Sequence, residues 1–202
     1  MARHCRFSLT WLRCKSRDAA VENKVTDQAD GLRRLMASKA GRQVAVVHCE
    51  PVAGVSSLTP NLAAALKQQG QDVLPLTEHG GPQSTPVKRG GLLVLIDAAL
   101  DSEGALSPSA AQSDHVLVAF QASAASITQA YLCIKRLHYA HALQRMKVLV
   151  YGAADAAEAK RLLANLATTA SRYLAVALEP AGWVRADPLL AQAQRLGLPV
   201  VE

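Results

Sequence analysis

The residues whose types and positions come closest to those of a phosphate-binding site form a short turn. It lies between an apolar stretch and a segment with helical spacing. A turn that binds phosphate needs glycines whose N–H groups converge on the anion, a lysine, and a hydroxyl for Mg²⁺. Here only Gly54 and the hydroxyl of Ser56 meet these needs. Pro51 has no N–H to donate, Val55 stands where the lysine is needed, and Glu50 adds a negative charge. The turn therefore lies where a phosphate site is expected, but it lacks most of the residues that bind phosphate.

The segments on either side of this turn predict the elements that would position it. Val44 to Val47 is a run of four apolar residues and predicts a buried strand. The residues after the turn that recur at helical spacing are Leu58, Leu62, Ala65 and Leu66. Gly70 lies where a helix usually ends. A strand, a turn and a helix in this order hold phosphate in nucleotide-binding proteins.

These residues resemble the MinD/ParA-type P-loop ATPases, and within them the flagellar-number regulators (FlhG, also called FleN). The family's deviant Walker A motif, K-G-G-V-G-K-T-T, lies between a V-A-V-V-type strand and a T-x-N-L-A-x-A-L helix. This pattern fits residues 44–66 without a gap. Its signature lysine falls on Glu50, its Walker lysine on Val55, and its two threonines on Ser56 and Ser57. The resemblance implies a degenerate nucleotide site, which also includes Gly54.

A second motif precedes the first predicted strand, in a segment that Thr26 or Asp27 can cap as a helix running to about Lys39. It reads D-Q-A-D-G-L-R and resembles the D-Q-A-x-x-L-R motif of the flagellar-number regulators. The candidate partner-binding residues are Asp27, Gln28, Ala29, Leu32, Arg33 and Leu35. The resemblance implies two partners: the GTPase that places flagella (FlhF) and a transcriptional activator of flagellar genes. The alternative is that the leucines only hold this helix on its own domain.

Three positions farther along the chain bear on the same nucleotide site. Asp97 follows the apolar run Leu92 to Ile96 and resembles the Walker B aspartate that holds the magnesium shell, although a lone aspartate there can also cap a turn. The family's D-x-D motif aligns with Thr77-Glu78-His79, where Glu78 is one position off. The adenine-binding asparagine falls on Tyr151, which lacks the amide's paired donor and acceptor.

Strand-like and helix-like segments alternate along the chain. The predicted strands are Val44–Val47, Val73–Leu76, Leu92–Ile96, Val116–Phe120, Val148–Tyr151 and one near Leu174–Leu178, and the later predicted helices are Ser123–His138 and Ala154–Ala170. This alternation predicts an α/β fold with a doubly wound, mostly parallel sheet of about six strands and helices on both faces. Pro75 predicts that the second strand lies at an edge or is irregular. By resemblance, the fold is a shortened MinD/ParA-like P-loop domain.

Charge and composition divide the 202 residues into three parts. Residues 1–24 hold six basic and two acidic side chains, so they carry a net charge of +4 out of the chain's total of +6. This charge predicts either a disordered tail or a basic arm that binds nucleic acid or anionic lipid. We expect the disordered tail, and no specific nucleic-acid binding. Residues 25–40 form the predicted motif helix and residues 41–202 the domain.

Other features predict a reduced, metal-free, cytoplasmic protein. The four cysteines are scattered, and His138 and His141 lack a third ligand of metal spacing. No apolar run approaches the roughly 20 residues that a membrane span needs. The family's C-terminal membrane helix has no counterpart, so stable membrane binding is not expected.

The sequence thus predicts a non-catalytic pseudo-ATPase that regulates flagellar number or placement by protein binding and needs no cofactor. The alternative is a weakened ATPase that still uses Ser56, Asp97 and Mg-ATP. Losing two charge-assisted phosphate contacts costs about 1.5–3 kcal/mol each, which lowers affinity by about two to four orders of magnitude. That estimate favours the pseudo-ATPase. The oligomeric state stays open.

Overall fold

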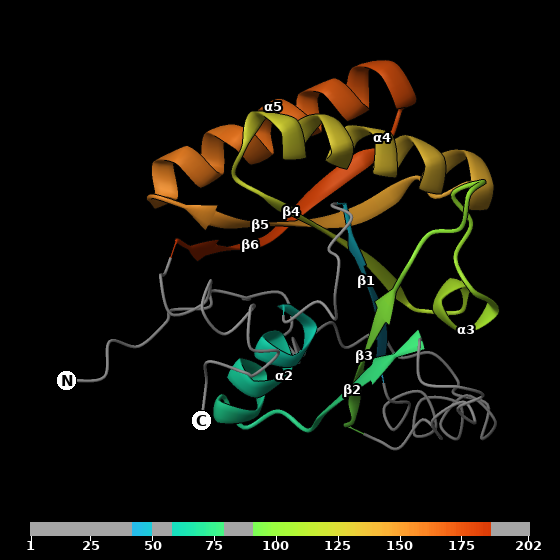
Figure 1. The fold of residues 1–202 in the computed structure, drawn as a ribbon, viewed down its shortest axis with the longest axis vertical. Helices are drawn as coiled ribbons and strands as arrows, with labels where there is room; N and C mark the ends of the chain where they lie inside the picture. Colours follow the sequence, from blue (N-terminus) through green and yellow to red (C-terminus); the bar gives the residue numbers. More distant parts are fainter. Residues whose placement is uncertain (1–41, 50–57, 79–90, 187–202) are drawn as a thin grey trace, which may run out of the picture.

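The computed structural model describes residues 42–49, 58–78 and 91–186, and these form one parallel sheet with helices on both faces (Figure 1). The strands are β1 (Arg42–His48), β2 (Val73–Thr77), β3 (Leu93–Ala98), β4 (His115–Gln121), β5 (Arg145–Ala153) and β6 (Ala177–Arg185). The helices are α2 (Leu58–Gln68), α3 (Pro108–Ala111), α4 (Ala124–His141) and α5 (Ala156–Leu174). The predicted α/β fold with six strands is confirmed.

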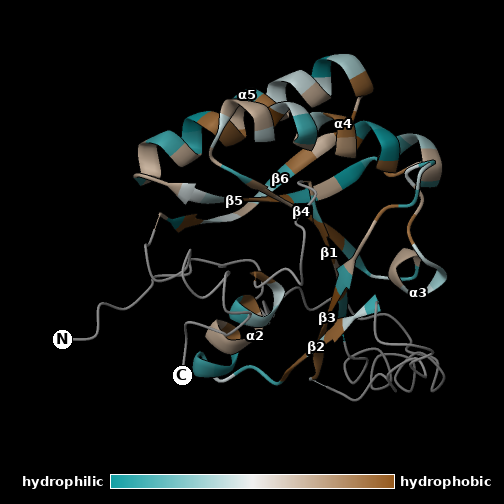
Figure 2. Cartoon of the chain, viewed as in Figure 1, coloured by the Kyte–Doolittle hydropathy of each residue, from teal (hydrophilic) through white to brown (hydrophobic). Residues whose placement is uncertain are grey.

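The strand order is β2-β3-β1-β4-β5-β6, and every neighbouring pair is parallel. Central strand β1 is buried on both faces because its side chains alternate. Val44 and Val46 belong to the apolar cluster on the α2 face, while Ala45 and Val47 belong to the cluster on the other face, which includes residues of α3, α4 and α5. Figure 2 shows the matching hydropathy, with β1 and β3 apolar and the outer sides of α4 and α5 mixed.

Helix α2 behaves as its spacing predicts. Leu58, Leu62 and Leu66 are buried against the sheet, and Gly70 ends the segment with a φ of +80°. A positive φ is open to glycine without the steric cost that a Cβ brings. The predicted edge position of β2 is also confirmed, since Pro75 lies in a strand at the end of the sheet order.

The last predicted strand exists but was placed too early. Leu174 ends α5 rather than beginning a strand, because it continues the buried helical stripe of Leu163, Leu166 and Ala170. Ala175 then adopts a left-handed conformation with a φ of 53°, which ends the helix, and β6 begins at Ala177. The predicted N-terminus of this helix was also two residues early, because Asp155 is the N-cap and accepts the N–H of Glu158.

The other predicted elements hold with longer bounds. The strand that was predicted to end before Asp97 runs through it to Ala98, and α4 extends three residues beyond His138. Within residues 42–49, 58–78 and 91–186, no helix is both long enough and apolar enough to cross a membrane.

Candidate functional site

The carboxyl ends of β1, β3 and β4 form the place where this topology can hold a ligand. After β1 the chain reaches α2 on one face of the sheet, and after β4 it reaches α4 on the other face. Open parallel sheets bind ligands where successive connections leave in opposite directions, because a crevice opens there. Of the positions that the sequence relates to the nucleotide site, Asp97, Glu78 and Tyr151 lie within the described ranges.

Asp97 lies inside β3, beside Val46 of β1 and Thr77 of β2. It alternates with Leu95, which packs with α2, so its side chain is on the α2 face. His48 lies two residues after Val46 and is on the same face. Two adjacent strands thus bring a carboxylate and an imidazole together at the carboxyl edge.

The imidazole of His48 makes two polar contacts there. Its Nε2 lies 3.2 Å from Oδ1 of Asp97 and 3.4 Å from Oγ1 of Thr59 on α2. An ionised carboxylate can only accept hydrogen bonds, so a hydrogen bond across the shorter contact requires the proton on Nε2. The two side chains are 10% and 15% exposed, and a carboxylate that far removed from water needs such a partner.

This arrangement does not fit a magnesium ion held by Asp97. Mg²⁺ requires near-octahedral coordination by oxygen atoms, most of them from water and phosphate. Here one oxygen of the carboxylate lies 3.2 Å from a ring nitrogen of His48. The donor set around Asp97 therefore favours an internal polar contact over a magnesium shell.

Both carboxylate oxygens of Glu78 accept hydrogen bonds from other residues of the chain. Its Oε2 accepts the N–H of Ala99 at 3.4 Å, and its Oε1 accepts a hydrogen bond from the hydroxyl of Ser107. Ser107 in turn caps α3 by accepting the N–H of Ala110. Glu78 thus ties the end of β2 to the segment that follows Asp97.

The connection from β3 to α3 is also fixed against the end of α4. Gly104 has a φ of +87°, and an added Cβ there would lie 2.5 Å from the Cβ of Arg136. The N–H of Leu106 donates to Nε2 of His141 at 2.8 Å. Because Nε2 accepts in this bond, it carries no proton. The segment after Asp97 is therefore held at both ends.

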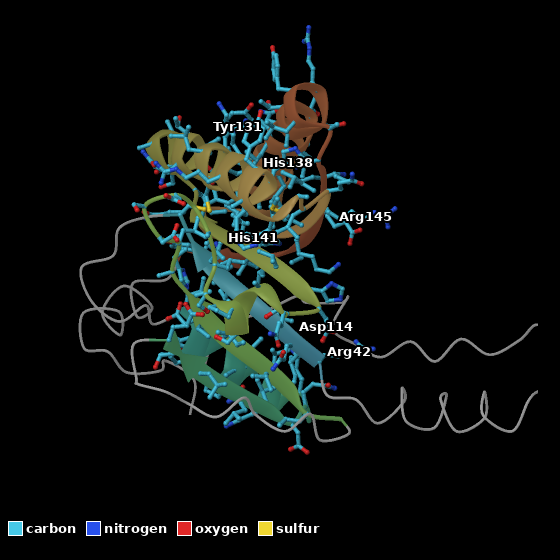
Figure 3. All side chains as sticks on the ribbon, turned by 90° about the vertical axis from the view of Figure 1, so that its right-hand side faces the viewer. Arg42, Asp114, Tyr131, His138, His141 and Arg145 are labelled. Carbon is cyan, nitrogen blue, oxygen red and sulfur yellow. The ribbon has the colours of Figure 1, made fainter. Side chains whose placement is uncertain are left out.

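His138 and His141 do not form a metal site. His141 binds the main chain of Leu106, whereas Nδ1 of His138 lies 2.9 Å from the carbonyl oxygen of Leu143. Figure 3 shows that both come from α4, with His141 nearer the sheet. Among the residues that the structure describes, no group of three or more His, Cys, Asp or Glu side chains could hold a metal ion.

Tyr151 is a core residue of β5. It is 9% exposed, faces the α2 side of the sheet and packs in the cluster that contains Leu149 and Val184. Its ring contributes apolar area to the core, at the position where the resemblance predicted an adenine-binding residue.

The other predicted site residues lie outside the described ranges and stay predictions. They are Glu50, Gly54, Val55, Ser56 and Ser57 of the nucleotide turn, and Asp27, Gln28, Ala29, Leu32, Arg33 and Leu35 of the motif helix. His48 is the site residue that sequence reasoning missed. The available signal was its spacing of two residues from Val46, which puts it on the same face as Asp97 in a parallel pair.

Comparisons with solved structures agree with the fold. The MinD cell division protein of Aquifex aeolicus matches with a TM-score of 0.54 and 15% identity, over 79% of this chain and 88% of that one. The chain has the fold of MinD. The MinD of the MinC:MinD cell division protein complex from the same organism matches equally well, over 79% of this chain and 87% of that chain. By sequence, no family model and no curated protein matches.

Proposed function

We propose that this chain is a non-catalytic regulator of flagellar number or placement, built on a MinD-like scaffold and acting in the cytoplasm by binding other proteins. The observation that supports it best is the contact between His48 and Asp97. The carboxylate that would hold a magnesium shell lies 3.2 Å from an imidazole of the same chain. The contact joins two strands of the folded core and involves one of the two oxygens of this carboxylate.

The sequence of the nucleotide turn supports the same proposal. Val55 cannot neutralise phosphate charge, and Glu50 repels it. In family members both positions hold lysine. An ATPase that loses both lysines and the magnesium ligand keeps neither the affinity nor the charge stabilisation that phosphoryl transfer requires.

The partner that we propose is the flagellar placement GTPase, an FlhF-like protein, with a flagellar transcriptional activator as a second partner. The support is the D-Q-A-x-x-L-R motif, which is intact in a chain whose nucleotide motifs have changed. Leu32 and Leu35 would supply the apolar anchor of the helix. In the family this segment stimulates the partner's GTPase, and Gln28 would orient water at the nucleotide, as glutamines do in other GTPases.

GTP hydrolysis by the placement GTPase tests the partner proposal. The full chain and a peptide of residues 25–40 should both raise the rate, and the Gln28→Ala versions should bind without raising it. If neither the chain nor the peptide binds the GTPase or changes its rate, the motif helix only packs on its own domain and the partner proposal fails.

Phosphate release by the chain itself tests the non-catalytic part of the proposal. The rate with Mg-ATP should equal that of an Asp97→Asn variant. A rate that falls when Asp97 is replaced would instead support the weakened ATPase.

A further inference from the structure

Large apolar side chains that face solvent gather on the outer side of α4 and α5. Among the described residues four such side chains are exposed, and three of them belong to these helices. They are Leu132 at 40%, Tyr139 at 70% and Tyr173 at 66%. Single exposed apolar residues are ordinary, but a concentration of them on one surface marks an interaction site.

Sequence spacing places three exposed side chains on one face of α4. Leu132, Lys135 and Tyr139 follow one another at i, i+3 and i+7, which puts them on one face of α4, while Ile134 and Leu137 face the sheet. Tyr173 lies in the last turn of α5, and α4 and α5 run side by side on the same face of the sheet (Figure 1).

Both helices follow parallel strands, so their C-terminal ends lie at the same edge of the sheet. We call Leu132, Lys135, Tyr139, Arg172 and Tyr173 the aromatic–basic surface.

The charge of this surface has one sign. Helix α4 contains no Asp or Glu, and α5 contains none from Arg161 to Leu174. The guanidinium of Arg172 lies 5.5 Å from the centre of the Tyr173 ring, within the range of a cation–π contact. Basic residues near a helix C-terminus are favoured by the helix dipole, which accounts for Arg172 but not for the exposed aromatic rings beside it.

We propose that the aromatic–basic surface binds an acidic, amphipathic helical segment of a partner protein. Leu132, Tyr139 and Tyr173 would contact the apolar face of that segment, because tyrosine and leucine bury large areas with few rotatable bonds. Lys135 and Arg172 would face its carboxylates and set its direction. A nucleic acid is a poorer match, since so few cations give weak, salt-sensitive binding and an aliphatic leucine adds no base stacking.

Fluorescence anisotropy with the full chain and a designed probe tests this proposal. The probe is a labelled helical peptide with leucines on one face and glutamates on the other. It should bind in the micromolar range, and a Tyr139→Ala/Tyr173→Ala variant should bind it about tenfold more weakly, as expected when interface anchors are removed. Circular dichroism should show the same helix content for variant and wild type.

Two double variants with the same change in net charge distinguish binding at this surface from a general attraction between the basic chain and the acidic peptide. Lys135→Glu/Arg172→Glu and Lys160→Glu/Arg161→Glu change the net charge equally, and only the first should abolish binding. Equal losses, a single-stranded oligonucleotide that binds more tightly than the peptide, or no peptide binding at about 1 mM would each overturn the proposal. The aromatic–basic surface shares no residue with the nucleotide turn or the motif helix, so these outcomes are independent of the proposed function.

Discussion

The carboxyl edge of the sheet and the outer surface of α4 and α5 use polar residues in opposite ways. At the edge, the described charged groups meet partners inside the chain: His48 contacts Asp97, and Glu78 accepts hydrogen bonds from Ala99 and Ser107. On the outer helices, aromatic and basic side chains face solvent. In this fold the edge is where ligands usually bind. At this edge the described polar groups therefore hold segments of the chain together, whereas those of the helix surface are exposed.

The largest effect that separates the two regions should come from His48→Ala. This substitution leaves the Asp97 carboxylate mostly buried without the imidazole, which should lower the free energy of unfolding by about 3 kcal/mol. The His48→Ala/Asp97→Ala double variant should be less destabilised than the sum of its single variants. Urea denaturation measures all four proteins. Additive losses would mean that the two side chains do not interact.

A smaller effect should come from the segment that joins the two regions. Gly104→Ala brings a Cβ within 2.5 Å of Arg136 at a φ of +87°, and we expect a loss of about 2 kcal/mol in thermal unfolding. Gly70→Ala is the matched control, because Gly70 has a similar φ of +80° but nothing within 4 Å of an added Cβ. It should cost about 1 kcal/mol. Equal losses would show that the contact with Arg136 is unimportant.

On the outer helices, Tyr139→Ala should change the free energy of unfolding by no more than about 0.5 kcal/mol, because the side chain is 70% exposed. The same urea experiment measures it beside His48→Ala. A loss as large as that of His48→Ala would mean that Tyr139 serves the fold, and the contrast between the two regions would disappear.

The smallest effect concerns pH and lies away from both regions, at the start of β4. Burial, and then the positive charges of Lys147 and Arg42, lower the pKa of His115 below its ordinary 6.5. The unfolded chain therefore binds this proton more readily, and the stability that His115 contributes is present above pH 6.5 and is lost as the pH falls below it.

His115→Gln should remove that part of the pH dependence, by at most about 0.5 kcal/mol because solvent screens an exposed side chain. Denaturation at about pH 7.5 and about pH 5.5 checks this. A difference between the two pH values that is unchanged in the variant would contradict the assignment to His115.

Most of the fold could be predicted because its signals are local. The apolar run Val44–Val47 and the spacing of Leu58, Leu62 and Leu66 each fix an element by burial. Near Leu174 the signal is ambiguous, since an apolar residue there fits the end of a helix as well as the start of a strand. In the structure Leu174 belongs to the helix, because it continues the buried face that includes Ala170, and the left-handed Ala175 ends the helix after it.

The candidate site was less predictable because its contacts join distant segments. Asp97 could be named from its place after an apolar run, but its partner His48 is 49 positions earlier and depends on the register of β1 and β3. The hydrogen bonds of Glu78 to Ala99 and Ser107 depend likewise on how β2 ends beside the next connection. The pattern of neighbouring residues does not predict which distant side chains will be in contact.

Calorimetric titration of the full chain with Mg-ATP tests the central claim most directly. With Glu50 and Val55 in place of lysines and Asp97 in contact with His48, the account predicts no saturable heat up to about 1 mM Mg-ATP. A MinD/ParA-type ATPase titrated in parallel shows that the measurement detects binding. A dissociation constant in the low micromolar range would contradict the claim that this MinD-like scaffold works without a nucleotide.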